Sequence, residues 1–297
     1  MFNIKRFQRS GVYLLLTVPP FCWAANAVLA RGVVELIPPV SFAFWRWTTA
    51  FLIIAPFALG QAKKDWRSVI GNWKILLFLS VCGISSFNTL LYTAVQTTTA
   101  INCALIQTTM PAVIILISMA VFKDKITKPQ AAGVGMCIFG ALLVVLRGKF
   151  SNLLHLVFVE GDLLMVIAVV MYALYSSFLR KRPGIHPISF LFYTFGVGSA
   201  ALLPLYLWER AYRQLPSLNY TVVASVLFVA VFPSIVAYFC WNRGVEIIGA
   251  NKAGLFINLT PVFAAAMAMI WLDEPLRIFQ VSGMLLILTG MVLFNRR

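Results

Sequence analysis

The chain has 297 residues, of which 61% are apolar and 11% charged, whereas soluble domains average roughly half apolar and a quarter charged. A membrane span needs about 20 apolar residues, so ten spans would use roughly 200 and leave no room for an ordinary soluble domain. The net charge of +15 would favour nucleic acid in a soluble chain. Here the basic residues lie between apolar runs, which indicates a topology signal and predicts no nucleic-acid partner.

Ten apolar stretches follow one another along the chain, and nine of them contain no charged residue. Each has a length typical of a transmembrane helix, in which every backbone polar group is bonded within the segment. The sequence therefore predicts an all-α membrane protein with ten spans at 11–30, 39–60, 75–95, 100–122, 129–146, 163–179, 188–208, 222–242, 253–272 and 278–294.

The first stretch also allows a second interpretation. A basic start and an apolar run precede the small residues Ala24-Ala25-Asn26-Ala27, as in a cleaved signal peptide. Losing it would leave nine spans and break the internal repeat described below. We therefore treat this stretch as the first span.

The distribution of basic residues predicts the orientation. With the amino terminus in the cytoplasm, the inner segments hold 17 of the 24 Lys and Arg residues and the outer segments hold six, while Arg46 lies within a span. Cytoplasmic loops carry the excess of Lys and Arg, so both termini are expected inside. The expected location is the bacterial plasma (inner) membrane, as a multi-pass protein.

The chain resembles itself at an offset of 150 positions. Six residues are identical at this offset, and most are Gly or Pro, which often mark helix ends and kinks. The span boundaries of the first half recur in the second. We expect two five-helix units, 1–150 and 151–297. Because five is odd, the second unit should be inverted relative to the first, as in secondary transporters. The six matches are Gly11 with Gly161, Ala100 with Ala250, Pro111 with Pro261, Gln130 with Gln280, Gly133 with Gly283, and Gly140 with Gly290.

Several motifs are spread over essentially the whole chain. They are Trp23-Ala24-Ala25-Asn26, Phe44-Trp45-Arg46-Trp47, Pro111 followed by Phe122-Lys-Asp124, and Pro261 followed by Trp271-Leu-Asp-Glu274-Pro275 and a helix opening with Gln280 and Gly283. They resemble the motifs of the EamA-type carriers of the drug/metabolite transporter superfamily, and the last is the most specific. The first half departs from this pattern, with Asp124 and Lys125 where Glu and Pro are usual. The resemblance implies a ten-helix secondary carrier, often an exporter of amino acids, other metabolites or toxic compounds.

Arg46 is the strongest single candidate for a substrate-binding residue, because a cation inside a span is costly unless it is paired, snorkels or faces water. One interpretation makes it the counter-charge for a substrate carboxylate. The other makes it a snorkelling or gate residue near the outer surface, bonded to Glu35 or to carbonyls and flanked by the interfacial Trp45 and Trp47.

Amides near or within the predicted spans, and aromatic rings beside them, complete the candidate site. Amides donate and accept hydrogen bonds, which suits a polar solute, although they also join helices to one another. Pro111 and Pro261 can kink their helices and free backbone carbonyls next to Gln107 and Asn258, respectively. The amides are Asn26, Asn88, Gln107, Asn242 and Asn258, and the rings are Trp23, Tyr92, Tyr172, Tyr175, Tyr238 and Trp241. We expect a central cavity lined by spans one, three, four, six, eight and nine, with spans five and ten at the periphery or at a homodimer contact.

Other functional classes find little support in the sequence. There is no GxxxxGK[ST] run for ATP, no CxxC pair, and only two histidines, so we expect no catalytic residues, metal or cofactor. The nine acidic residues lie in loops or at span ends, which disfavours a midplane carboxylate relay. The preferred hypothesis is a carrier that exports amino acids or related metabolites by alternating access. A multidrug exporter and a passive facilitator are the alternatives.

Overall fold

The computed structural model describes residues 4–125, 127–149, 159–213 and 219–295, and every regular element in these ranges is helical. Seven helices are long and apolar enough to cross a membrane: Gly11–Gly32, Pro39–Gly71, Trp73–Ala94, Ala100–Phe122, Glu160–Lys181, Pro187–Tyr212 and Tyr220–Ile248. Three shorter apolar helices cover Lys128–Val144, Phe256–Trp271 and Ile278–Gly290. The all-helical membrane class is therefore confirmed.

The first half contains three uninterrupted helices, one helix with a π-helical segment in its middle, and one helix that is broken. α1 spans Ile4–Gly32, α2 spans Pro39–Gly71, and α7 spans Lys128–Val145. A π-helical segment, η1 (Ser80–Ser86), joins α3 (Trp73–Leu79) to α4 (Phe87–Ala94). The helix that follows breaks between α5 (Ala100–Gln107) and α6 (Met110–Phe122).

The second half repeats this plan. α9 (Glu160–Phe178) and the short η2 (Leu179–Lys181) precede α10 (Pro187–Tyr212). The π-helical η3 (Ala230–Val236) joins α11 (Tyr220–Val229) to α12 (Ala237–Ile248). Next come α13 (Ala250–Ala253), the 3-10 helix η4 (Gly254–Leu259), α14 (Thr260–Trp271) and α15 (Ile278–Asn295).

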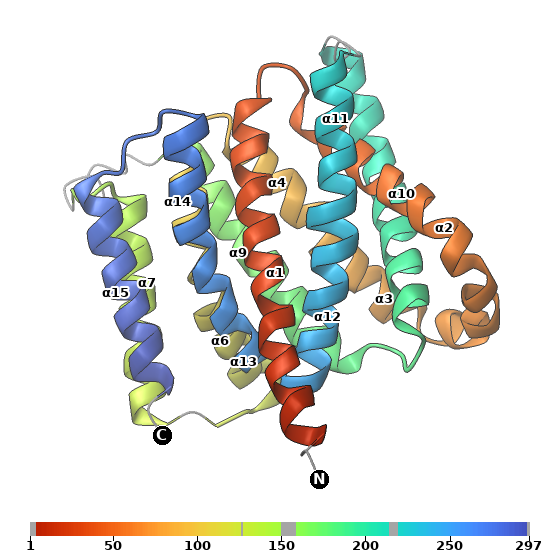
Figure 1. The fold of residues 1–297 in the computed structure, drawn as a ribbon, viewed down its shortest axis with the longest axis horizontal. Coiled ribbons are helices and arrows are strands. Elements are labelled where there is room, and N and C mark those ends of the chain that lie inside the picture. The colour runs from red at the N-terminus through yellow and green to blue at the C-terminus, as the bar shows by residue number, and fades with distance from the viewer. Residues whose placement is uncertain (1–3, 126, 150–158, 214–218, 296–297) are drawn as a thin grey trace.

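The irregular turns of the two halves fall at equivalent positions. The π segments begin at Ser80 and Ala230, and the helices after the breaks resume at Met110 and Thr260. Each pair is separated by the same 150 positions that relate the sequence identities. One equivalent pair also runs in opposite directions: α7 rises and α15 descends side by side at the left edge of Figure 1.

Close backbone packing joins α7 to α15. A Cβ on Gly140 would lie 2.9 Å from the carbonyl oxygen of Gly283, and one on Gly290 would lie 2.6 Å from that of Gly133. Small residues at such contacts let two membrane helices approach closely. This pair lies at the edge of the molecule (Figure 1), the peripheral position expected for spans five and ten.

The second helix is longer than its apolar stretch. The sequence predicts a span that ends at residue 60, whereas α2 continues through Lys63, Lys64 and Asp65 to Gly71. Charges end a membrane span because they seek water, but they do not end a helix when no breaker follows. Tyr193 donates a hydrogen bond to the Ala62 carbonyl (2.9 Å), which ties this extension to α10.

Candidate binding site

Arg46 lies about two turns into α2 and has no exposed surface. Snorkelling toward the outer surface is therefore wrong. Glu35 is not among the partners of Arg46, whereas the expected bond to a carbonyl is found at Pro233. The choice between a gate and a substrate ligand stays a prediction. The flanking Trp47 is also fully buried, so only the partly exposed Trp45 fits the expected interfacial position. The reason is that three other helices cover this stretch of α2 and supply polar partners for the guanidinium.

Three predicted residues surround one nitrogen of Arg46. Its Nη1 lies 2.9 Å from Asn26 Oδ1, 2.7 Å from Asn88 Oδ1 and 2.7 Å from the Tyr92 hydroxyl. Tyr92 also donates to Asn26 Oδ1 at 2.7 Å, so the group forms one network. Each of these residues was predicted separately from the sequence. The fold brings them into contact by packing α1, α2 and α4 against one another.

The π segment of the second half supplies the other acceptors. Arg46 Nε donates to Ser234 Oγ (2.6 Å), and its Nη2 donates to the Pro233 carbonyl (3.0 Å). The equivalent carbonyl of the first half, at Gly83, accepts a hydrogen bond from Tyr238 (2.5 Å). π turns are frequently found at functional sites. The sequence analysis missed Ser234 and Pro233, although a Pro-Ser pair inside an apolar stretch is itself a polar signal.

All five partners of Arg46 are neutral. The ion pairs found within 4.0 Å in the described ranges involve Arg31, Arg180, Arg182 and Arg243, and none involves Arg46. Two acids, Asp162 and Glu209, are buried, but they lie at helix ends and bond to Thr98 and to the start of α2. Each nitrogen of the guanidinium therefore has a partner, but Nη2 has a single acceptor for its two N–H groups, and the charge has no acid beside it.

Aromatic rings extend from Arg46 toward the opposite helices. The guanidinium carbon lies 4.6 Å from the centroid of the Trp47 ring, which is 5.2 Å from the Tyr238 ring. The remaining predicted rings continue the series at centroid separations of 5.3–6.3 Å: Trp23, Tyr172, Tyr175 and Trp241. We call these rings, with Trp47 and Tyr238, the aromatic cluster.

Several buried donors around this cluster have no hydrogen-bond partner. They are the indole N–H groups of Trp47 and Trp241 and the amide nitrogens of Asn88 and Asn242. The Tyr172 hydroxyl is unpartnered as well. Leaving a buried donor unsatisfied costs about 1–3 kcal/mol, so several such groups at one place indicate a site that a ligand completes.

A polar pocket of about 640 Å³ approaches the cluster from one end of the molecule. Asn242 and Ser176 line its inner part, and Asn242 Oδ1 accepts a hydrogen bond from Tyr175 (2.7 Å). The basic residues Arg180, Arg182 and Lys252 and the single acid Glu246 line it nearer the rim. The pocket thus ends where the aromatic cluster begins.

Two predicted residues lie apart from this network. Gln107 and Asn258 are buried at the helix breaks, where Gly254 of η4 packs against Pro111 of α6. No hydrogen bond or ring contact found among the described residues joins either amide to Arg46 or to the aromatic cluster. Their role in substrate binding stays a prediction.

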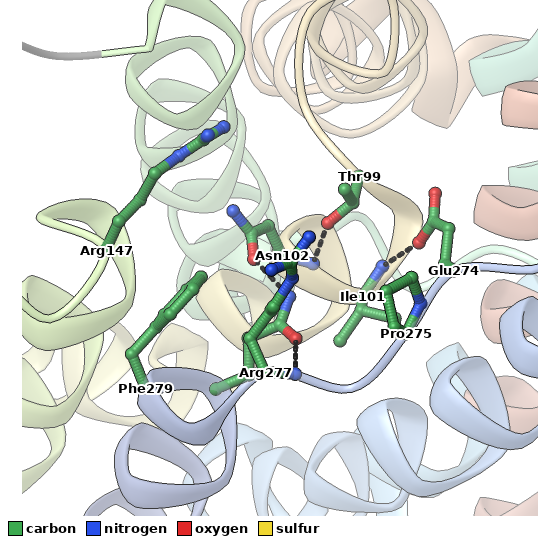
Figure 2. Close-up of a pocket in the computed structure, with 9 residues that line it drawn as sticks. Thr99, Ile101, Asn102, Arg147, Glu274, Pro275, Arg277 and Phe279 are labelled. Atoms are coloured by element: carbon green, nitrogen blue, oxygen red, sulfur yellow. Dashed lines mark hydrogen bonds between the residues drawn. The ribbon is translucent and has the colours of Figure 1, made fainter.

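A second pocket, of about 320 Å³, lies where loop 95–99 meets the turn before α15. Figure 2 shows Thr99, Asn102, Arg147 and Glu274 around it. The Glu274 carboxylate accepts hydrogen bonds from the backbone N–H groups of Ala100 (3.1 Å) and Ile101, capping α5. A carboxylate at a helix N-terminus is stabilised by the free N–H groups and the helix dipole, so this contact holds the two halves together.

Sequence comparisons identify the class of protein as a membrane transporter. The profile of the EamA-like transporter family matches residues 10–146 and again 159–296. The chain belongs to this family, within the drug/metabolite transporter superfamily.

Two of its relatives are named as uncharacterized transporters. The uncharacterized transporter YyaM of Bacillus subtilis (strain 168) is 30% identical over 95% of this chain and 92% of its own length. YetK, another uncharacterized transporter of that strain, is 24% identical over 95% of this chain and 86% of its own length. A solved crystal structure with 17% identity shares the fold, with a TM-score of 0.69 over 96% of both chains.

Proposed function

We propose that this protein is a secondary carrier that exports amino acids or related small metabolites across the bacterial plasma membrane by alternating access. The observation that carries the proposal is the buried Arg46 network with its aromatic cluster, to whose edge the 640 Å³ pocket leads at Asn242 and Ser176. A site near the middle of the fold, between two related halves, is typical of alternating-access carriers.

We further propose ten spans in two inverted five-helix halves, 1–150 and 151–297, with both termini in the cytoplasm. The excess of basic residues in the inner segments supports this orientation, and the matched helix interruptions support the division. In this topology the 640 Å³ pocket opens to the cytoplasm, where an exporter takes up its substrate.

Reporter fusions test the topology. Alkaline phosphatase fused after Arg297 is expected to be inactive, because the enzyme needs the oxidising environment outside the cytoplasm. The same reporter fused after Asp273, in the preceding outer turn, is expected to be active. An active fusion after Arg297 would contradict the ten-span orientation.

Counterflow in proteoliposomes tests the transport mechanism. Vesicles containing the purified protein are loaded with a mixture of unlabelled amino acids and diluted into a trace of the labelled mixture. A carrier is expected to accumulate label transiently and to saturate, because its site faces one side at a time. Linear, non-saturating equilibration would favour the passive facilitator. Accumulation of a quaternary ammonium dye and of no amino acid would favour the multidrug exporter.

A further inference from the structure

The Arg46 site has the electrostatic character of a site for an anion. A cation inside a membrane protein is costly, and such residues normally pair with an acid or face water. Arg46 does neither, since it is fully buried and its partners are two amides, two hydroxyls and one carbonyl. A ligand that brings a negative charge would complete this site.

The unpartnered hydrogen-bonding groups independently indicate the same chemistry. Those on Trp47, Asn88, Trp241 and Asn242 are N–H donors, and the two other groups near the cluster, the hydroxyls of Tyr172 and Ser176, can donate as well as accept. A carboxylate only accepts, at about four positions, and forms paired hydrogen bonds with a guanidinium. The orientation of Asn88 is set by Arg46, because its Oδ1 accepts from Nη1 and its Nδ2 is left to donate elsewhere.

The aromatic cluster indicates the rest of the ligand. Its rings meet edge to face or tilted, for example Trp23 against Tyr172 at 5.5 Å and 75°. Such walls pack well against flat or branched apolar groups. Rings also attract cations, but the Trp47 ring already has the Arg46 guanidinium 4.6 Å from its centroid, and a second positive charge would be repelled.

From these observations we infer that the substrate carries a carboxylate that binds Arg46, and an aromatic or branched apolar body that packs on the aromatic cluster. Cationic amines that lack an acid group are excluded as substrates. This inference rests on the proposed carrier function and narrows its substrate class. The basic rim of the cytoplasmic pocket, with Arg180, Arg182 and Lys252 against the single acid Glu246, would attract the same anions.

Three probes that share a phenylethyl body separate the charge types: 3-phenylpropionate, phenylalanine and 2-phenylethylamine. Counterflow of each is measured with the full-length protein in proteoliposomes, together with the rise of its unfolding temperature on binding. We expect at least one of the two acids to bind and exchange, and the amine to do neither. The response to 3-phenylpropionate against phenylalanine tells whether a simple carboxylate or an amino acid is preferred.

Two variants test the role of the guanidinium. Arg46→Lys keeps the charge and loses the paired donors, so binding of the preferred acid should weaken by about 10- to 100-fold while acids stay favoured over the amine. Arg67→Gln, a charge change at an exposed position of the same helix, should behave as the wild type.

The outcomes separate the inference from the proposed function. Exchange of the amine equal to or faster than that of both acids would overturn the substrate class and leave the carrier function intact. Unchanged binding of the acids by the Arg46→Lys variant would also overturn the class. Absence of counterflow for all three probes and for the amino acid mixture would overturn both.

Discussion

Replacing Arg46 by glutamine is expected to abolish transport without lowering the stability of the fold. The guanidinium is buried without a counter-ion, and the desolvation of such a charge costs several kcal/mol. A neutral glutamine avoids this cost, and its amide nitrogen reaches about as far as Arg46 Nε, which donates to Ser234 Oγ. The side chains that lose Nη1 can still bond to one another, as Tyr92 already does to Asn26. We expect the free energy of unfolding to stay within about 1 kcal/mol of the wild type or to rise, since replacing buried ionic groups is often neutral or stabilising.

The matched variant is Asn88→Leu, which removes an acceptor and keeps the charge. It removes one of the three acceptors around Arg46 Nη1, and a hydrogen bond to a charged group contributes about 1.5–3 kcal/mol, so stability should fall by about that amount. Both variants are compared by thermal unfolding in the same detergent and by counterflow of the acidic probes. If Arg46→Gln lost as much stability as Asn88→Leu, Arg46 would be a structural residue and its proposed role in binding would fail.

The second large effect is expected for Gly83→Ala, in the π segment of the first half. A Cβ there would lie 2.3 Å from Cδ2 and 2.5 Å from Cγ of Tyr175, near the stem of the ring, which has little freedom to move. Tyr175 would have to leave its hydrogen bond with Asn242 at the inner end of the 640 Å³ pocket. Overpacking of this kind costs about 1–3 kcal/mol, and transport should fall with it.

Gly60→Ala is the control for this variant, because a Cβ at that position of α2 meets no atom within 4 Å. Alanine is favoured over glycine inside a helix by about 1 kcal/mol, so this variant should be as stable as the wild type or slightly more stable. Heat unfolding and counterflow of both variants provide the measurement. Equal stability of the two would show that the contact between Gly83 and Tyr175 does not constrain the fold.

The sequence predicted the helical elements well where the signal was local. Apolar stretches marked the helices, although the charged end of α2 was read as a loop, since hydropathy reports the membrane boundary and not the helix end. The π segments were not predicted. One contains Pro233 and the other contains no proline, so local sequence does not explain why both halves interrupt their helices at the same place.

The residues of the candidate site were predicted from the sequence, but the contacts between them were not. Polar residues inside spans are rare enough to be noticed, so Arg46, Asn26, Asn88 and Tyr92 were all named. Gln107 and Asn258 were named on the same grounds, and the fold puts them at the helix breaks instead. Trp47 was read as an interfacial anchor because tryptophans near a span end usually are.

The sequence by itself determined the membrane class, the family and the internal offset of 150 positions, because hydropathy, motifs and self-similarity are properties of the chain alone. Only the tertiary structure decided that Arg46 is buried, that its partners are neutral, and that unpaired donors gather beside it. Those facts depend on contacts between residues as far apart as Arg46 and Ser234, 188 positions along the chain. The net charge of a buried site is set by which helices pack together, and no local pattern contains that information.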